Sequence, residues 1–197
     1  MHLASLKKLL AKPSPIILPG VYDALSAKMA VQAGFEAIYL SGSALAMSCF
    51  GYPDVGLVTM SEVIDQLRNV VTAADVPVIV DIDTGFGNAI NVWRTIKSAE
   101  NAGAVAVQLE DQVFPKRCGH FEGKQIIPTD EMVGKIRAAT AARNTELCII
   151  ARTDARAVCG LQEAIQRGIE YANAGAEIIF IEAPRSKEEL IEIAKAI

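Results

Sequence analysis

The sequence has few cysteines and does not arrange them as a metal or disulfide framework. Its four cysteines are Cys49, Cys118, Cys148 and Cys159, and no two form a close CxxC pair. This spacing does not match a zinc or redox site, and the cysteine density is far below that of a small secreted scaffold. We therefore expect free thiols and a cytoplasmic location.

Long hydrophobic runs and runs of one charge are also missing. No apolar stretch reaches the length of a membrane span. The helix-like stretch Leu3–Lys12 contains Lys7 and Lys8 and does not resemble a signal peptide. The 19 Lys and Arg against 23 Asp and Glu give a net charge of −4 without clustering. We expect neither nucleic acid nor a membrane as a partner.

What is present is the composition of one globular domain. The 197 residues are 51% hydrophobic and 21% charged, which is enough to bury a substantial core, so we treat residues 1–197 as a single domain. Short apolar runs typical of buried strands recur along the chain. They are Ile16–Leu18, Ala37–Leu40, Val78–Ile82, Ala104–Leu109, Leu147–Ala151 and Glu177–Ile181.

Stretches with helical spacing lie between these runs. They are Tyr22–Ala33, Met60–Ala74, Ala89–Ala102, Thr129–Arg143, Leu161–Ala174 and Lys187–Ile197. Three of them run into an Ala-Gly step, at Gly34, Gly103 and Gly175, where a left-handed glycine would end the helix before the next strand. Alternating elements with nearly continuous apolar strands predict a parallel sheet covered by helices.

The repeating units favour a barrel over a dinucleotide-binding fold. No GxGxxG turn follows the first expected strand. The predicted fold class is α/β, a (β/α)8 barrel of the TIM type that is apparently truncated to about six β/α units, because a full barrel needs eight strands and roughly 250 residues. A truncated product, a barrel completed by a partner and an open variant all remain open at this point.

The most reactive stretch follows the fourth apolar run. Cys118 stands between Arg117 and Gly119, close to Lys116 and His120. Cationic neighbours lower the pKa of a cysteine, and glycine allows close backbone approach to a small ligand. The loop lies beyond the carboxyl end of a strand, which is the reactive face of parallel α/β folds. The alternative is an unreactive loop cysteine.

Carboxylates also gather at strand ends. Asp81 and Asp83 are two residues apart and would face the same side of the third strand, and Glu110 and Asp111 end the fourth. Oxygen ligands of this kind suit Mg²⁺, with Mn²⁺ also possible. The competing interpretation is that these carboxylates cap the following helices or pair with lysines.

Three strings together resemble a known family. Lys116-Arg117-Cys118-Gly119-His120, Asp81-Ile82-Asp83-Thr84-Gly85-Phe86-Gly87 and Tyr39-Leu40-Ser41-Gly42-Ser43 resemble the isocitrate lyase/phosphoenolpyruvate mutase superfamily, and within it the 2-methylisocitrate lyases. The cysteine pentapeptide separates the lyases from the mutases. The resemblance implies Mg²⁺-dependent retro-aldol cleavage of a 2-hydroxy tricarboxylate into pyruvate and succinate.

The same resemblance implies a role for each matching residue. Asp83 would hold the metal directly, and Asp81 and Glu110 would contact it largely through water. Substrate would be bound by residues from several strand ends. They are Ser41, Gly42, Ser43, Asp54, Lys116, Arg117, Gly119, Arg152 and Glu182.

The resemblance also implies how protons are handled. Cys118 would protonate the departing carbanion as a general acid. Tyr39, assisted by Arg152, would handle the hydroxyl proton, and His120 would act in or orient the loop. Tyr39 is equally a packed core tyrosine, and Arg152 could form a structural ion pair with Asp154.

Substrate and assembly are less sharply defined by the sequence. The loop version His120-Phe121-Glu122-Gly123-Lys124 does not separate a methylisocitrate lyase from a dimethylmalate lyase or an oxaloacetate hydrolase or decarboxylase. Members of the family continue through two further β/α units and form homo-oligomers, commonly tetramers. An inactive remnant is the remaining alternative.

Overall fold

A curved parallel sheet forms the centre of the molecule. The computed structural model describes residues 2–119 and 121–197. Its strands lie in chain order across the sheet, each parallel to the next. They are β1 (Gly20–Val21), β2 (Ile38–Leu40), β3 (Val78–Asp81), β4 (Ala106–Glu110), β5 (Cys148–Thr153) and β6 (Ile178–Ile181).

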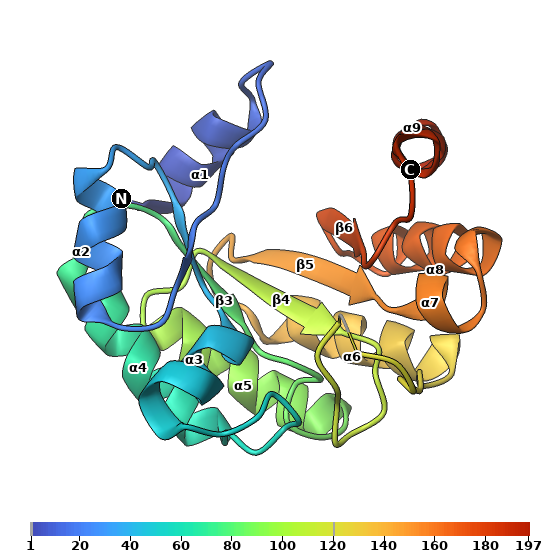
Figure 1. The fold of residues 1–197 in the computed structure, drawn as a ribbon, viewed down its shortest axis with the longest axis horizontal. Helices are drawn as coiled ribbons and strands as arrows, with labels where there is room; N and C mark the ends of the chain where they lie inside the picture. Colours follow the sequence, from blue (N-terminus) through green and yellow to red (C-terminus); the bar gives the residue numbers. More distant parts are fainter. Residues whose placement is uncertain (1, 120) are drawn as a thin grey trace.

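Helices connect and cover the strands. They are α1 (His2–Leu10), α2 (Ala24–Gln32), α3 (Gly42–Phe50), α4 (Met60–Ala73), α5 (Ala89–Asn101), α6 (Thr129–Ala142), α7 (Ala155–Val158), α8 (Leu161–Asn173) and α9 (Lys187–Ala196). Helices α2, α4, α5, α6 and α8 contact one another in sequence along the outer face of the sheet (Figure 1). This is the arrangement of a β/α barrel wall.

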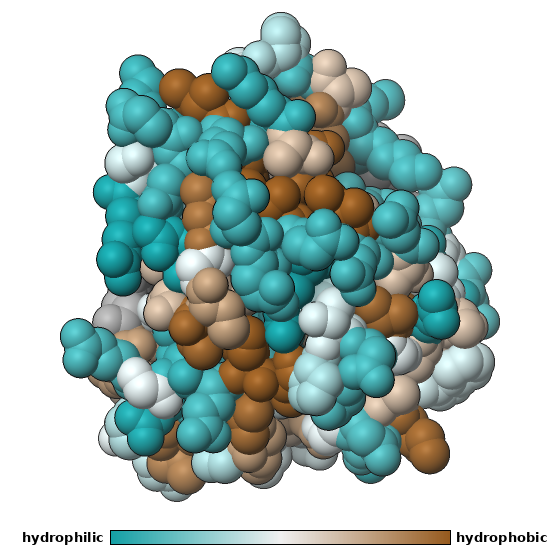
Figure 2. All heavy atoms as spheres, turned by 90° about the vertical axis from the view of Figure 1, so that its right-hand side faces the viewer, coloured by the Kyte–Doolittle hydropathy of each residue, from teal (hydrophilic) through white to brown (hydrophobic). Residues whose placement is uncertain are grey.

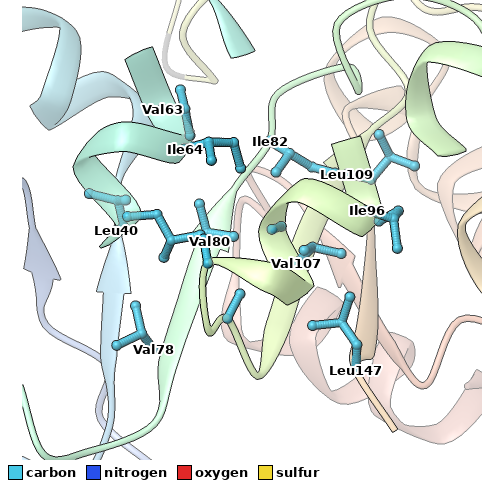
Figure 3. Packing of buried hydrophobic residues seen from close by; sticks show 14 of the residues in the cluster. Leu40, Val63, Ile64, Val78, Val80, Ile82, Ile96, Val107, Leu109 and Leu147 are labelled. Carbon is cyan, nitrogen blue, oxygen red and sulfur yellow. The ribbon is translucent and has the colours of Figure 1, made fainter. Parts of the chain in front are cut away.

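The main core lies between the sheet and this outer layer. Val80 and Val107 project from neighbouring strands, and Ile64 and Ile96 meet them from α4 and α5 (Figure 3). All four are buried. Burial of one such side chain contributes about 1.5–3 kcal/mol, so this layer holds the strands in register.

The inner face of the sheet is covered differently. Leu6 and Leu9 of α1 pack against Ile79 and Ala106. Beside them lies an apolar cavity of about 540 Å³, whose lining includes Phe180 of β6. From the side on which β6, α8 and α9 lie, several groups of hydrophobic residues reach the middle of the surface, with hydrophilic residues between and around them (Figure 2). Within the described residues, β1 and β6 each pair with one strand only.

The predicted α/β architecture is confirmed, with local corrections. The first strand is Gly20–Val21 and not Ile16–Leu18. Pro15 and Pro19 flank the predicted run, and proline has no N–H to donate to a ladder. The ladder begins instead where Pro19 O accepts from Tyr39 N, at 3.0 Å.

Two helices were absent from the prediction. Helix α3 begins directly at Gly42, with Ser41 as its N-cap accepting a hydrogen bond from Ala44 N, so the expected Ser41-Gly42-Ser43 loop is in fact a helix start. Helix α7 is a single short turn after β5. The three helix-ending glycines were predicted correctly, because Gly34, Gly103 and Gly175 have φ values of 89°, 97° and 112°.

Candidate active site

The carboxyl ends of the strands surround one polar pocket of about 340 Å³. Its walls come from β2, β3, β4, β5 and β6 together with the loops that follow them. The lining residues are Tyr39, Ser41, Ser43, Asp54, Asp81, Gln108, Lys116, Cys118, Gly119, Arg152, Phe180 and Glu182. Ten of these twelve are residues that the sequence assigned to the site.

Asp83 lies just beyond β3 in an unusual conformation. Its φ of 46° is in the left-handed region, which costs energy for a residue with a side chain. Asp81 Oδ1 accepts a hydrogen bond of 3.0 Å from Asp83 N. The two carboxylates therefore converge through a tight turn, and the predicted strand alternation is not the reason, because β3 ends at Asp81.

The start of α3 approaches both carboxylates closely. A Cβ placed on Gly42 would lie 3.2 Å from Asp81 Oδ2 and 3.2 Å from Asp83 Oδ1. Glycine leaves this space free, and the absence of a side chain allows the helix start to face the acidic pair. Gly42 thus lies at the site although it does not line the pocket itself.

Lys116 is the cation nearest to the acidic pair. Its side chain is buried, and Nζ donates to Asp54 and lies 2.9 Å from Asp83 Oδ1. Burial lowers the pKa of Lys116, but the negative charges of Asp83, Asp81 and Glu110 more than offset this, so the pKa is raised. Lys116 is therefore charged at neutral pH.

Among the described residues, two buried carboxylate oxygens lack a hydrogen-bond partner. They are Glu110 Oε1 and Asp83 Oδ1, the second of which lies 2.9 Å from the Lys116 ammonium in an ion pair. Burial, followed by repulsion from Asp81, raises the pKa of Asp83 to about 6. Burial also raises the pKa of Glu110 well above its usual range, against the opposing effect of Arg152. The site holds more negative charge than its cations balance.

A divalent cation fits this donor set. Unpartnered buried carboxylate oxygens are energetically costly, and a hard cation with oxygen ligands removes that cost. No three acidic, histidine or cysteine side chains in the described part of the chain converge as a closed metal cluster. Mg²⁺ is commonly bound through one or two carboxylates with water completing its coordination, so an open set around Asp83 suits it.

Arg152 contacts three carboxylates around the pocket, those of Glu110, Asp154 and Glu182. Its guanidinium donates to Asp154 from Nε (3.0 Å) and Nη2 (3.1 Å). It also lies 3.4 Å from Glu110 and 3.6 Å from Glu182. The ion pair with Asp154 that the sequence left as an alternative is present, and Arg152 lines the pocket as well.

Tyr39 is held on the floor of the pocket by Gln108. Gln108 Nε2 donates to Tyr39 Oη at 2.8 Å. Burial, followed by the charge of Asp81, raises the pKa of Tyr39 well above its ordinary value. The hydroxyl therefore stays protonated at neutral pH and can donate a hydrogen bond. A role as the base that removes a proton is disfavoured.

The cysteine loop, which is the segment between β4 and α6 that carries Cys118, borders this pocket. Gln112 braces it with two hydrogen bonds to the Arg117 backbone, at 2.9 and 3.0 Å. Cys118 and Gly119 face the cavity, whereas Arg117 is exposed and its guanidinium lies 3.4 Å from Glu122 O. The expectation that Arg117 lines the site is not met. His120 lies outside the described residues.

Asp111 is not part of the acidic cluster. Its carboxylate accepts hydrogen bonds from Thr153 Oγ1, Tyr171 Oη and Arg167 Nη1 at 2.7, 2.8 and 3.2 Å. Successive side chains of an extended chain face opposite sides, so Glu110 and Asp111 diverge. The expectation that both contribute to one cation site is wrong for Asp111.

Sequence reasoning missed three residues around the site. Gln108 had a visible signal, since it is a polar residue inside an otherwise apolar run. Phe180 gave none, because an aromatic residue in a strand is ordinarily core. The sequence held no signal for Lys124 either, because lysine is rarely buried and only the fold shows that it pairs with Asp154.

Comparison with known proteins places these features in a family. The phosphoenolpyruvate phosphomutase family model matches residues 6–197. The chain is 49% identical to a 2,3-dimethylmalate lyase of Eubacterium barkeri, covering 98% of this chain and 68% of that protein. It is 50% identical to a 2-methylisocitrate lyase of Aeropyrum pernix, covering 98% of this chain and 62% of that protein. The chain thus spans about two thirds of these relatives.

Solved structures agree in fold. A crystal structure of 2,3-dimethylmalate lyase superposes with a TM-score of 0.96 at 38% identity, covering 100% of this chain and 67% of that one. The structure of oxaloacetate acetylhydrolase with the inhibitor 3,3-difluorooxalacetate superposes with a TM-score of 0.96 at 35% identity, covering 100% of this chain and 68% of that one. The structure of phosphonopyruvate hydrolase with oxalate and Mg²⁺ superposes with a TM-score of 0.89 at 36% identity, covering 99% of this chain and 68% of that one. The chain belongs to the phosphoenolpyruvate mutase/isocitrate lyase superfamily.

Proposed function

We propose that this protein is a Mg²⁺-dependent carbon–carbon lyase that cleaves a 2-hydroxy carboxylic acid of the 2-methylisocitrate type into a 2-oxo acid and a dicarboxylate. The observation that carries the proposal is that Cys118 shares one pocket with Arg152 and Asp81, and that this pocket adjoins Asp83. A proton donor, a carboxylate-binding cation and a cation-binding acid are the groups that this cleavage needs.

Asp83 would hold the cation, with Asp81 and Glu110 around it. When bound, the cation would supply positive charge that stabilises the negative charge on the substrate hydroxyl oxygen as its proton leaves. Similarity to phosphonopyruvate hydrolase, whose complex holds oxalate and Mg²⁺, supports this assignment. Mn²⁺ has the same preference for oxygen ligands and would substitute.

The chain's own residues would orient the substrate. Arg152 lines the pocket, and because Asp154 accepts from its Nε and Nη2, the N–H groups of the guanidinium that remain would donate to a substrate carboxylate. The Ser41 and Ser43 hydroxyls and Lys116 add donors on the α3 side. Arg117 is left out of the binding set because it is exposed outside the pocket.

Proton transfer follows from the same arrangement. Cleavage breaks the carbon–carbon bond next to the hydroxyl, the hydroxyl proton leaves, and the new carbanion takes a proton. Cys118 would donate that proton as a thiol. Tyr39 is protonated and would donate a hydrogen bond to substrate oxygen, so the hydroxyl proton would pass to a carboxylate of the pocket, of which Asp81 and Glu182 are available.

The proposed substrate is tested by steady-state rates on a panel. We expect 2-oxo acid release from 2-methylisocitrate with Mg²⁺, loss of that release with EDTA, and recovery with Mn²⁺. Turnover of 2,3-dimethylmalate at a higher kcat/KM would move the assignment to the dimethylmalate branch. Absence of cleavage of every hydroxy acid, in folded protein with Mg²⁺ present, would overturn the proposal.

A second candidate is hydrolysis of oxaloacetate. It is favoured by the TM-score of 0.96 to oxaloacetate acetylhydrolase, which equals that to dimethylmalate lyase. The same panel separates the two, since the hydrolase would release oxalate and acetate from oxaloacetate. The lyase assignment requires that kcat/KM for oxaloacetate be the lower value.

A further inference from the structure

A buried lysine stands behind the cysteine loop. The Lys124 side chain is 3% exposed, although it lies in the loop between β4 and α6. A lysine is rarely buried unless its charge is paired, because removing an ammonium group from water is costly. Its burial therefore points to specific partners.

Those partners lie on two different segments. Lys124 Nζ is 3.0 Å from Asp154 Oδ1, just after β5, and Asp154 is fully buried. The same ammonium donates to the carbonyl oxygen of Gly119, the residue after Cys118. We call these two contacts the Lys124 clasp. The clasp joins the cysteine loop to the end of β5.

Asp154 is shared between this clasp and Arg152. The guanidinium of Arg152 donates to both carboxylate oxygens, and Asp154 N donates to Asp111 Oδ1 at 2.9 Å. Asp111 in turn is held by Thr153 and by residues of α8. Because its backbone and both oxygens are engaged, Asp154 is a rigid anchor for Lys124 and Arg152 together.

The Lys124 clasp holds the cysteine loop at Gly119, which lies close to Arg152. A Cβ on Gly119 would lie 2.4 Å from Arg152 Nη2 and 2.7 Å from Glu182 Oε1, so backbone and guanidinium are in close contact. The position of Cys118 relative to Arg152 therefore depends on where Gly119 O is held. Lys124 is the side chain that holds it.

We propose that Lys124 is a positioning residue, which fixes Cys118 over the pocket by clasping Gly119 O to the carboxylate that also orients Arg152. The expected effect of Lys124 on kcat rests on the proposed function. The placement of Cys118 can be measured without turnover. Lys124 does not line the pocket, so it acts through Gly119 and Asp154.

The test is the alkylation rate of Cys118 by iodoacetamide, measured by peptide mass spectrometry between pH 6 and 9. The pH series separates accessibility from a change in the pKa of Cys118. Cys49 and Cys159 are exposed and serve as internal references in every sample. The variants are Lys124→Gln and Lys124→Met, with Lys124→Arg to restore the cation. Lys28→Gln on the exposed face of α2 is the matched control.

We expect the rate for the Cys118 thiolate to rise at least fivefold in Lys124→Gln and Lys124→Met, and to return toward the wild-type rate in Lys124→Arg. Lys28→Gln should leave it unchanged. In the lyase assay, Lys124→Met should lower kcat at least tenfold while KM changes less than threefold, because the binding groups stay in place.

An unchanged Cys118 rate in a folded Lys124→Met variant overturns the proposal. So does failure of both neutral variants to fold, since the role would then be structural only. If wild-type protein shows no lyase activity but the alkylation rates shift as expected, the proposed function fails and the positioning role stands.

Discussion

At the scale of single residues, the site concentrates negative charge that its own cations do not balance. Asp83 combines a strained backbone with a buried carboxylate, and its raised pKa of about 6 records the cost of ionising it. The pKa in the folded protein lies above the ordinary value of 3.8, so this group favours the folded state at low pH and loses that contribution as pH rises through about 6. The loss is about 3 kcal/mol, at about 1.4 kcal/mol for each pKa unit.

Cation binding should therefore depend on pH through Asp83. We expect Mg²⁺ to raise the melting temperature little at pH 5 and more at pH 7.5, because below about pH 6 protons compete for the carboxylate. Asp83→Asn should abolish the Mg²⁺ effect at both pH values. Differential scanning calorimetry with and without Mg²⁺ measures this. Equal Mg²⁺ stabilisation in Asp83→Asn would place the cation elsewhere.

Gly119 offers a second residue-scale prediction. In Gly119→Ala the new methyl group would overlap Arg152 Nη2, so the loop or the Arg152 side chain must shift; kcat should fall at least tenfold with a small change in melting temperature. Gly134→Ala is the control, since nothing lies near its Cβ position in α6, and it should stabilise the protein by about 0.5–1 kcal/mol. Full activity in Gly119→Ala would show that the loop is not pressed against Arg152.

At the scale of elements, α8 is tied to the active face through buried polar contacts. Tyr171 and Arg167 of α8 bind Asp111, and Asp111 binds Thr153 and the Asp154 backbone. Arg167 also donates to Ile127 O, at the end of the cysteine loop. One helix on the outer face thus fixes two segments that shape the pocket.

This network predicts that two conservative substitutions, Asp111→Asn and Tyr171→Phe, lower the free energy of unfolding by different amounts. Asp111→Asn should lower the free energy of unfolding by about 3 kcal/mol, because it leaves Arg167 without its buried counter-charge. Tyr171→Phe removes one of several donors to Asp111 and should cost about 1 kcal/mol. Urea titrations provide both values. Equal losses would mean that the charge of Asp111 contributes nothing beyond hydrogen bonding.

The elements also show how far sequence reasoning reaches. Buried strands and glycine-ended helices were predictable because apolar periodicity and left-handed glycines are local signals. Helix α3 was not, since Ser41, Gly42 and Ser43 read equally as a loop, and only the packing of its buried Leu45 and Ala46 shows a helix. The site carboxylates were identified, but the opposite direction of Asp111 depends on partners in α8 that lie far along the chain.

At the scale of the whole molecule, a parallel sheet collects groups from five strands at one edge. The six β/α units were predictable from sequence, and within the described chain the two outer strands remain unpaired on one side. None of the described helices is long and apolar enough to cross a membrane. The curved sheet and its outer helices form the scaffold (Figure 1). This scaffold places Arg152 and Cys118 in one pocket with Asp83 next to it, although the three are far apart in sequence.

The resemblance to the family further leads us to expect a homo-oligomer. Exposed apolar side chains such as Phe180, Leu190 and Ile191 are compatible with a covered surface on the β6 and α9 side. Light scattering coupled to size exclusion should give a mass that is a multiple of 21.0 kDa, with a tetramer as the expected state. A monomer at micromolar concentration would contradict this expectation.

The central claim is that one pocket joins cation-assisted cleavage to proton delivery from Cys118. The most direct measurement is cleavage of 2-methylisocitrate in D₂O with Mg²⁺, followed by analysis of the succinate. The account predicts succinate with one deuterium in a single configuration, since Cys118 approaches from one face, and predicts loss of cleavage in Cys118→Ser. Deuterium in both configurations, or undiminished cleavage in Cys118→Ser, would contradict it.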